Sequence, residues 1–385
     1  QIDGQLPIVG VNSFGFGGTN AHVVLEASPV RYGLDRQTTS VSSSSISRVK
    51  RADRPLVLPL SAKDDASLHR YAEAYWNRLC DPSLEVQDFC TAAGTAKEHH
   101  ERRLVVSGQN ATQLRRRLRA WLDGAEEVKG VFSGRSSKSG RELTFVYTGQ
   151  GAQWWAMGQQ LLDREPLFLQ VLEEIDTKLK SLAGWSLLDA MRSTKEDSPT
   201  DRTNVAQPAI FALQVGLTKL WESWGIVPAR VIGHSVGEVA AAYCAGIYSL
   251  DDAVSIIFQR SRLQHSTGGH GRMLAVGLSQ DEANRAIGNQ RDRVQVAVIN
   301  NPNLVTLAGD TEPLEQLAKQ FEEQGRFMRW LPIDYAFHTH QMDPIRDELL
   351  SVLEHIQPRK ARIPFISTVT AKEISGTKLD AEYWW

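Results

Sequence analysis

A glycine-flanked serine near the middle of the chain constrains the fold more than any other feature. Residues 233–238 read Gly-His-Ser-Val-Gly-Glu, follow the apolar run 229–232 and precede a helix-forming stretch at 239–243. A strand, a sharp turn with a small residue on each side of the serine, and a helix together form a nucleophile elbow. The pattern therefore predicts an α/β unit that exposes the Ser235 hydroxyl at a helix N-terminus, where free N–H groups can stabilise an oxyanion.

The composition narrows the class of protein. The 385 residues are 42% hydrophobic and 23% charged, which is typical of a globular protein of roughly two or three domains. With 43 Lys and Arg against 45 Asp and Glu, no overall charge favours binding to nucleic acid or to an anionic membrane. No apolar run approaches the roughly 18 residues of a membrane span. Cys80, Cys90 and Cys244 lack metal-ligand spacing and are too few for a disulfide framework, which favours a reducing cytoplasm.

Changes in composition predict four parts along the chain. Residues 1–30 contain two short strands around a glycine-rich loop, and residues 31–55 are polar and serine-rich, which predicts a flexible linker. Residues 56–140 open with an apolar strand, continue in helical patterns to about residue 125, and carry no catalytic pattern. In residues 141–385 strands alternate with helices, which indicates a parallel α/β sheet. Within it, an amphipathic helix is expected over 208–224, with Pro208 in its first turn. The chain begins with Gln1 and ends in bulky aromatic residues, so we expect a piece of a longer protein.

Residues 273–333 differ in pattern from the segments around them. Strands are expected at 273–276, 294–299, 304–307 and 327–331. One helix starts at the capping box formed by Ser279 and Glu282, and a second covers about 313–323. The order β-α-β-β-α-β is that of a ferredoxin-like unit. Inserted into the larger α/β domain, it would form a cleft, which is a favoured place for a ligand.

A serine hydroxyl needs a base within hydrogen-bonding reach to act as a nucleophile. His338 lies where the inserted unit returns the chain to the large domain, so its position favours it. His340 is a nearby rival, and His234 adjoins the serine, although on a sharp turn its side chain would point away. Gln150, on the turn 149–151, would offer a backbone N–H that could form an oxyanion hole together with that of Val236. A plain tight turn explains the same residues equally well.

Arg260 carries the information about specificity. The segment 249–264 predicts a helix capped by Ser249 and Asp252, and Arg260 falls on its apolar stripe whereas Arg262 does not. The apolar members of that stripe are Ala253, Ile256, Ile257 and Leu263. A buried guanidinium needs an anionic partner, either an internal Asp or Glu or a substrate carboxylate. Beside a serine–histidine cleft we favour a substrate carboxylate, because arginine recognises that planar group with two hydrogen bonds.

Taken together, these motifs resemble the acyltransferase domain of modular type I polyketide synthases and related multifunctional fatty acid synthases. The resemblance runs from about residue 56 to the end, and its landmarks are residues 149–153, 233–238, 259–262, 335–338 and 367–370. Residues 8–26 resemble the last strands of a ketosynthase, and residues 56–130 resemble the linker domain between ketosynthase and acyltransferase. The implied fold is a large α/β-hydrolase-like subdomain with a parallel sheet and an inserted ferredoxin-like subdomain, preceded by a small α/β linker domain.

The resemblance also implies a reaction and its participants. Ser235 would be the acylated nucleophile, His338 the general acid and base, and Arg260 the group that binds the free carboxylate of a malonyl-type unit. In a ping-pong reaction of polyketide biosynthesis, the acyl group would pass from CoA to the phosphopantetheine thiol of an acyl carrier protein. The adjacent ketosynthase would be a second partner, and the domain itself would bind no metal or cofactor.

The size of the acyl unit is the least determined point. In the family that the chain resembles, Val236 and Phe337 match the malonyl pattern, whereas Tyr335 matches the methylmalonyl one. We favour malonyl because a bulky Phe337 would crowd an α-methyl group, although one methyl group is worth only about 1–3 kcal/mol. Two other functions stay open. A serine thioesterase or proofreading hydrolase would use Ser235 and His338 without needing Arg260, and a structural piece of a synthase would use none of them.

Overall fold

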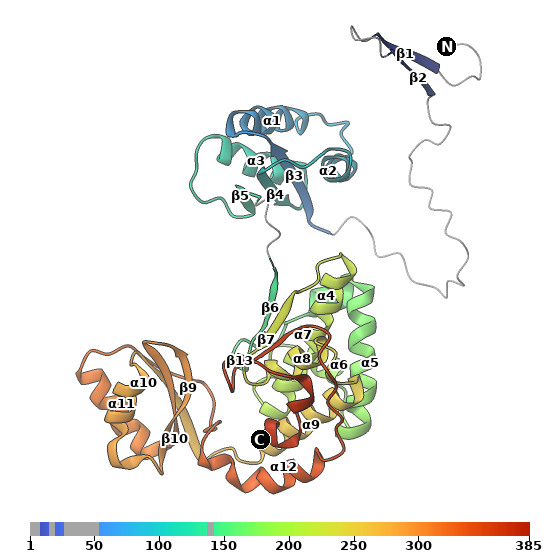
Figure 1. Cartoon of the computed structure of the whole chain (residues 1–385). Coiled ribbons are helices and arrows are strands. Elements are labelled where there is room, and N and C mark those ends of the chain that lie inside the picture. Colours follow the sequence, from blue (N-terminus) through green and yellow to red (C-terminus); the bar gives the residue numbers. More distant parts are fainter. Residues whose placement is uncertain (1–7, 15–19, 27–53, 137–141) are drawn as a thin grey trace. The chain divides into compact units, whose positions relative to one another are not determined.

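The computed structural model describes residues 8–14, 20–26, 54–136 and 142–385 (Figure 1). The chain divides into two compact units, residues 1–53 and 54–385. In the first unit, β1 (Ile8–Phe14) and β2 (Asn20–Glu26) form an antiparallel hairpin in which Ile8 pairs with Glu26. These are the two strands expected around the glycine-rich loop. All but the last two residues of the predicted linker 31–55 lie outside the described residues.

The second unit opens with a small α/β region that has its own core. Its elements are β3 (Leu56–Ala62), α1 (Asp65–Arg78), α2 (Val86–Thr95), β4 (Arg102–Gly108), α3 (Ala111–Leu122) and β5 (Val131–Arg135). The three strands form an antiparallel sheet in the order β3-β4-β5. Apolar residues alternate along β3 and β4, so that Leu58, Leu104 and Val106 are fully buried against the helices. The expectation of helical patterns throughout 61–125 missed β4, which interrupts them.

A larger region follows, built on a sheet in the order β13-β12-β7-β6. Three strands are parallel, namely β6 (Thr144–Tyr147), β7 (Arg230–Gly233) and β12 (Phe365–Ser367). The short β13 (Lys372–Glu373) adds an antiparallel edge. The helices are α4 (Gln159–Arg164), α5 (Pro166–Ala183), α6 (Leu187–Arg192), α7 (Thr203–Ser223), α8 (Gly237–Cys244), α9 (Leu250–His265), α12 (Arg346–Val352) and α13 (Ala381–Trp384).

Helix α7 corrects one expectation. It begins at Thr203, before the predicted start at 208, so Pro208 lies inside the helix and not in its first turn. A proline there removes a backbone hydrogen bond. The helix is nevertheless buried on nearly every side from Val205 to Ala212, and its contacts with α5, α8 and α9 supply the stability that the local sequence lacks.

The inserted unit has the expected order. It comprises β8 (Gly271–Val276), α10 (Gln280–Ile287), β9 (Val294–Asn301), β10 (Leu304–Asp310), α11 (Thr311–Glu323) and β11 (Met328–Trp330), drawn in orange in Figure 1. Its antiparallel sheet runs β11-β8-β10-β9 around a separate core, and the capping box of Ser279 and Glu282 is present. The predicted fold class is therefore confirmed: a large subdomain on a parallel sheet, an inserted ferredoxin-like subdomain and a preceding small α/β region.

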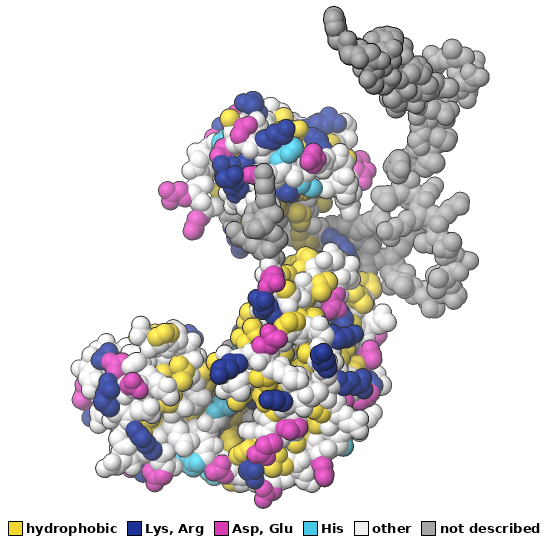
Figure 2. All heavy atoms as spheres, viewed as in Figure 1, with side chains coloured by type: hydrophobic (Ala, Val, Ile, Leu, Met, Phe, Trp, Pro, Cys, Tyr) yellow, Lys and Arg dark blue, Asp and Glu magenta, His cyan; other side chains and the backbone are white. Residues whose placement is uncertain are grey.

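The surface agrees with the near-neutral composition. On the face shown in Figure 2, basic and acidic side chains are interspersed and form no large surface of one sign. Within the described residues, no helix is both long and apolar enough to cross a membrane.

Candidate active site

The serine turn has the backbone of a nucleophile elbow. Strand β7 ends at Gly233, α8 begins at Gly237, and Ser235 between them has a φ of 51°, in the left-handed region that side chains rarely adopt. A Cβ at Gly233 would overlap the backbone of Glu238, and one at Gly237 would overlap the carbonyl of Tyr147. Both glycines are therefore required by close approach of the backbone, and the strained turn projects the serine from the end of the strand.

The structure brings one of the three candidate histidines to this serine. His338 Nε2 lies 3.0 Å from Ser235 Oγ, although the two residues are 103 positions apart. His338 also has a positive φ, of 61°, on the segment that leads from β11 back to the large region. His340 points elsewhere, with its backbone N–H donating to Gln295 and its Nε2 3.9 Å from Asp310. His234 is exposed, and no described hydrogen bond joins it to the serine.

His338 has the protonation state that a base requires. Part of the residue is exposed to solvent, but protein atoms crowd its ring. That desolvation, together with the positive charge of Arg260 and the neighbouring His234, lowers the pKa of His338 to about 4. The imidazole is therefore neutral near pH 7, and a nitrogen is free to accept the serine proton.

Arg260 is buried, as the apolar stripe of its helix predicted. Its Nη2 donates a hydrogen bond to Ser235 Oγ at 3.1 Å. Its Nη1 donates to Gln207 Oε1 at 2.5 Å and to Gln264 Oε1 at 3.1 Å. Arg262, by contrast, lies at the surface and pairs with Glu348 at 2.7 Å. The helix α9 starts at the predicted capping box of Ser249 and Asp252, which sets the phase that turns Arg260 inward.

None of the ion pairs in the described part of the chain includes Arg260, so no internal Asp or Glu neutralises it directly. Burial lowers the pKa of Arg260 to about 10, while the negative charge of Glu238 acts in the opposite direction. The guanidinium therefore stays protonated near pH 7. Its positive charge faces the serine and is met by amide and hydroxyl oxygens.

The turn that carries Gln150 passes directly beside the elbow. A Cβ on Gly149 would lie 2.9 Å from His234 Cδ2 and 3.6 Å from Ser235 Cβ. The Gln150 side chain donates to Thr203 Oγ1 at 3.0 Å, which anchors the turn to the start of α7. Val236 is buried and stands immediately before α8; no described hydrogen bond uses its N–H, whereas the N–H of Gly237 donates to the His234 carbonyl. The two-donor oxyanion hole of Gln150 and Val236 stays a prediction.

Tyr335 and Phe337 form one buried aromatic stack on the segment that ends at His338. Their rings are nearly parallel, with centroids 4.9 Å apart and an angle of 8° between planes. The Tyr335 hydroxyl lies 2.7 Å from His265 Nδ1, so it is held against α9. Phe337, which matches the malonyl pattern, and Tyr335, which matches the methylmalonyl pattern, therefore pack as a single pair.

A pocket of about 530 Å³ adjoins the pair of Ser235 and His338. Its polar lining comes from Arg260, Gln264, Gln295, His338, Thr339, His340 and Asp343. Its apolar lining comes from Met342, Ile345, Leu349, Val369, Trp384 and Trp385. The pocket thus combines the buried cation of Arg260, the carboxylate of Asp343 and an apolar wall.

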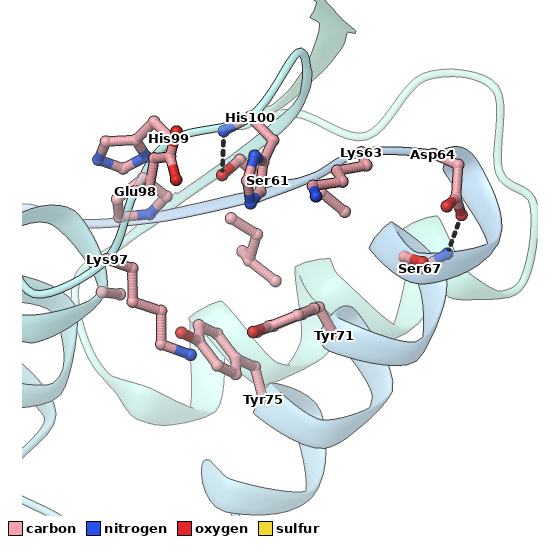
Figure 3. A pocket seen from close by; sticks show the side chains of 14 residues that line it. Ser61, Lys63, Asp64, Ser67, Tyr71, Tyr75, Lys97, Glu98, His99 and His100 are labelled. Atoms are coloured by element: carbon pink, nitrogen blue, oxygen red, sulfur yellow. Dashed lines mark hydrogen bonds between the residues drawn. The ribbon is translucent and has the colours of Figure 1, made fainter. Parts of the chain in front are cut away.

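A second pocket, of about 470 Å³, lies in the small α/β region beside β3 and α1. In Figure 3 the Lys97 amino group points toward the rings of Tyr71 and Tyr75, at 4.6 and 5.4 Å from their centroids. Acidic Asp64 and Glu98 line it together with the basic groups, so it favours no ligand of one charge. His338 and Arg260 converge instead on Ser235, so we take that position as the candidate active site.

Sequence reasoning missed a clamp on the elbow. The buried Glu238 carboxylate accepts hydrogen bonds from the Thr368 N–H and hydroxyl, each at 2.7 Å, and from the Tyr383 hydroxyl at 2.8 Å. The Thr368 hydroxyl also lies 3.1 Å from the Gly233 carbonyl, so it contacts both sides of the serine turn. The available signal was an acidic residue at the start of an otherwise apolar helix. Gln207 and Gln264, the partners of Arg260, carried no such signal.

Three comparisons place this geometry in a family. The acyl transferase domain family matches residues 144–385, and the ketoacyl-synthetase C-terminal extension family matches residues 1–106. Erythronolide synthase EryA2 of Saccharopolyspora erythraea is 35% identical over 375 residues, which cover 97% of this chain and 10% of that protein. The pikromycin polyketide synthase component PikAIII of Streptomyces venezuelae is 35% identical over 389 residues, covering all of this chain and 23% of that protein. The chain therefore spans a minor part of the curated relatives that it matches.

A solved structure agrees with the family matches and with the curated relatives. The acyltransferase domain from module 8 of the salinomycin polyketide synthase is 35% identical, with a TM-score of 0.80 over 86% of this chain and 78% of that one. The acyl transferase match alone covers more than half of the chain, and it contains every residue of the site described above. The chain belongs to the acyltransferase family, in the form found in modular polyketide synthases, with ketosynthase extension sequence at its N-terminal side.

Proposed function

We propose that this acyltransferase moves a malonyl-type extender unit from CoA to the phosphopantetheine thiol of an acyl carrier protein. The reaction would serve polyketide biosynthesis and take place in the reducing cytoplasm. The observation that carries the proposal is the convergence on one hydroxyl. Ser235 Oγ lies 3.0 Å from a neutral histidine nitrogen and 3.1 Å from a buried guanidinium. The first group activates the nucleophile, and the second selects an acyl group that carries its own carboxylate.

The chemistry follows in two matched halves. His338 Nε2 accepts the Ser235 proton as Oγ attacks the thioester carbonyl, and backbone N–H groups of Gln150 and Val236 stabilise the resulting oxyanion. When the tetrahedral intermediate collapses, the C–S bond breaks and the CoA thiolate takes the proton from His338. The acyl-Ser235 ester remains. The pantetheine thiol then gives its proton to His338 and its sulfur attacks the ester carbonyl. The C–O bond to Ser235 breaks, Oγ takes the proton back from His338, and the acyl group leaves as the new thioester.

We favour malonyl over methylmalonyl because of how Phe337 packs. Phe337 is held in place by its stack on Tyr335, so it cannot easily move aside for an α-methyl group. The hydrogen bond of Tyr335 to His265 makes the pair stiffer still. Because one methyl group contributes only about 1–3 kcal/mol, we expect a preference and not an absolute exclusion.

The partners follow from the reaction and from the neighbouring sequence. They are malonyl-CoA, an acyl carrier protein and the adjacent ketosynthase of the same synthase. The domain contributes its own side chains and no bound cofactor, and no group of metal ligands occurs among the described residues. A hydrolase stays the alternative enzyme, because the same serine and histidine can pass an acyl group to water.

Intact-protein mass spectrometry after mixing with malonyl-CoA tests the proposal. We expect a malonyl adduct on the wild-type chain that is absent from Ser235→Ala and disappears when a pantetheinylated carrier protein is added. Rapid release of free malonate without carrier would support the hydrolase instead. A chain that never forms an adduct would indicate a structural role.

A further inference from the structure

The partners of Arg260 are unusual for a buried cation. Gln207 Oε1 and Gln264 Oε1 both accept from Arg260 Nη1, while Gln207 Nε2 donates to Gln264 Oε1 at 2.8 Å. All three side chains are buried, and Gln207 comes from α7 whereas the other two belong to α9. The cation is therefore held by two neutral amides on two different helices.

The hydrogen bonds determine how each amide is oriented. A guanidinium has donors only, so Gln207 must turn its oxygen toward Arg260 and its nitrogen toward Gln264. Gln264 must then turn its oxygen toward both donors. In this arrangement both amide oxygens accept from Arg260 Nη1, Gln207 Nε2 also lies 3.4 Å from Gln150 Oε1, and the guanidinium is held with Nη2 directed at Ser235 Oγ.

Neutral acceptors have a consequence that a carboxylate would not have. An amide oxygen orients the guanidinium without cancelling its charge, so apart from the opposing charge of Glu238 the electrostatic demand of the buried cation stays unmet. A carboxylate at the same place would form an internal ion pair, and an incoming substrate carboxylate would then find its partner already neutralised.

We propose that Gln264 and Gln207 are specificity-determining positioning residues, which hold Arg260 rigid while reserving its charge for the carboxylate of the acyl group. This inference rests on the proposed function. It predicts that selectivity for a carboxylated acyl group depends on the neutrality of these side chains and not only on the presence of Arg260.

The variant Gln264→Glu tests this with almost no change in shape. The Gln264 oxygen only accepts hydrogen bonds, so a carboxylate oxygen in its place can accept the same bonds from Arg260 and Gln207. Gln207→Glu is the second variant, but there a carboxylate oxygen would face the Gln264 oxygen in place of a donor. Gln264→Glu is therefore the cleaner change.

A matched control is available in the same pocket. Gln295 also lines it, and its oxygen accepts from the His340 N–H at 2.9 Å, so Gln295→Glu keeps that bond. The control adds the same charge to the same cavity without a described contact to Arg260. It separates neutralisation of Arg260 from general repulsion of an anionic substrate.

The measurement is the ratio of kcat/KM for acylation of Ser235 by malonyl-CoA to that by acetyl-CoA. In Gln264→Glu we expect the ratio to fall at least tenfold, mainly through the malonyl reaction, and to fall at least about threefold further than in Gln295→Glu, where only repulsion across the pocket acts. The acid limb of the acetyl reaction should also shift to higher pH in Gln264→Glu, because the charge of Arg260 contributes to the lowered pKa of His338.

An unchanged ratio in both Gln264→Glu and Gln207→Glu, or an equal fall in Gln295→Glu, would overturn the inference. Failure of the proposed function gives a different result. In that case the wild-type chain itself would show no preference for malonyl over acetyl, whatever the variants do.

Discussion

Replacing Arg260 with alanine is the most direct test of how the site chooses its acyl group. The change removes the hydrogen bond from Nη2 to Ser235 Oγ, at 3.1 Å, and the positive charge that no described ion pair neutralises. These two losses should affect substrates differently. The first concerns every acyl group, whereas the second concerns only those with a free carboxylate.

The magnitudes can be estimated separately. A hydrogen bond from a charged donor contributes about 1.5–3 kcal/mol, so its loss should slow acylation by either CoA ester by roughly 10- to 150-fold. Losing the partner of a buried carboxylate costs about 2–5 kcal/mol more, which should slow malonyl transfer further by roughly 30-fold to several thousand-fold. The hydrogen-bond loss is common to both esters, so the ratio of the two rates should move by at least about 30-fold against malonyl.

Single-turnover acylation of Ser235, followed by intact mass with each CoA ester, measures both rates on the same preparation. Arg262→Ala is the matched control, since that arginine lies two residues along the same helix, at the surface, and pairs with Glu348. Thermal unfolding of each variant checks that the fold is retained. If the two acyl groups slow equally in Arg260→Ala, the carboxylate role is refuted, and the arginine serves only to orient the serine.

Four further predictions concern the same site. The pKa of His338 lies at about 4, and the neutral ring is the base. We therefore expect kcat/KM for acetyl-CoA to stay constant down to roughly pH 5 and to fall about tenfold per pH unit below pH 4. A pH–rate profile with its acid limb near pH 6.5 would contradict this. Arg260→Ala should move that limb upward, since it removes one cause of the low pKa. Thr368→Val deletes the hydroxyl that contacts Glu238 and Gly233, so the free energy of unfolding should drop by about 1–3 kcal/mol, with a lower kcat at unchanged KM. Denaturant titration measures the stability and steady-state kinetics measure the rate. A variant as stable as the wild type would show that these hydrogen bonds do not stabilise the serine turn. Phe337→Ser should raise the methylmalonyl-to-malonyl ratio by about 10- to 200-fold in competitive acylation, and an unchanged ratio would show that Phe337 does not limit the acyl unit.

Local patterns predicted the elements that local physics controls. The two capping boxes, at Ser249 and Ser279, start the helices that they predicted, because a cap acts within one turn of backbone. The phase of α9 then buried Arg260 and exposed Arg262, as periodicity requires. The start of α7 was predicted wrongly, because Pro208 is normally a signal for a first turn and only the surrounding helices make an interior proline tolerable.

The site was predicted only in part, because local sequence patterns do not reveal contacts between residues that are far apart in the chain. Position along the chain favoured His338 over its neighbours, and the geometry agrees, while the catalytic role itself stays a prediction. Glu238 went unnoticed because its partners, Thr368 and Tyr383, come from the far end of the sequence. Gln207 was hidden for a similar reason, since a glutamine within an apolar helix is uninformative until its partner is known.

The sequence by itself determined the serine turn. Its glycines are required by backbone contacts within a few residues and with the neighbouring strand, so residue type was enough to predict the elbow. Only the tertiary structure decided what the serine meets. A histidine 103 positions away and an arginine held by neutral amides from two helices converge on one oxygen atom. Such distances depend on how separate elements pack against one another, and that packing decides that the charge of Arg260 remains available to a substrate.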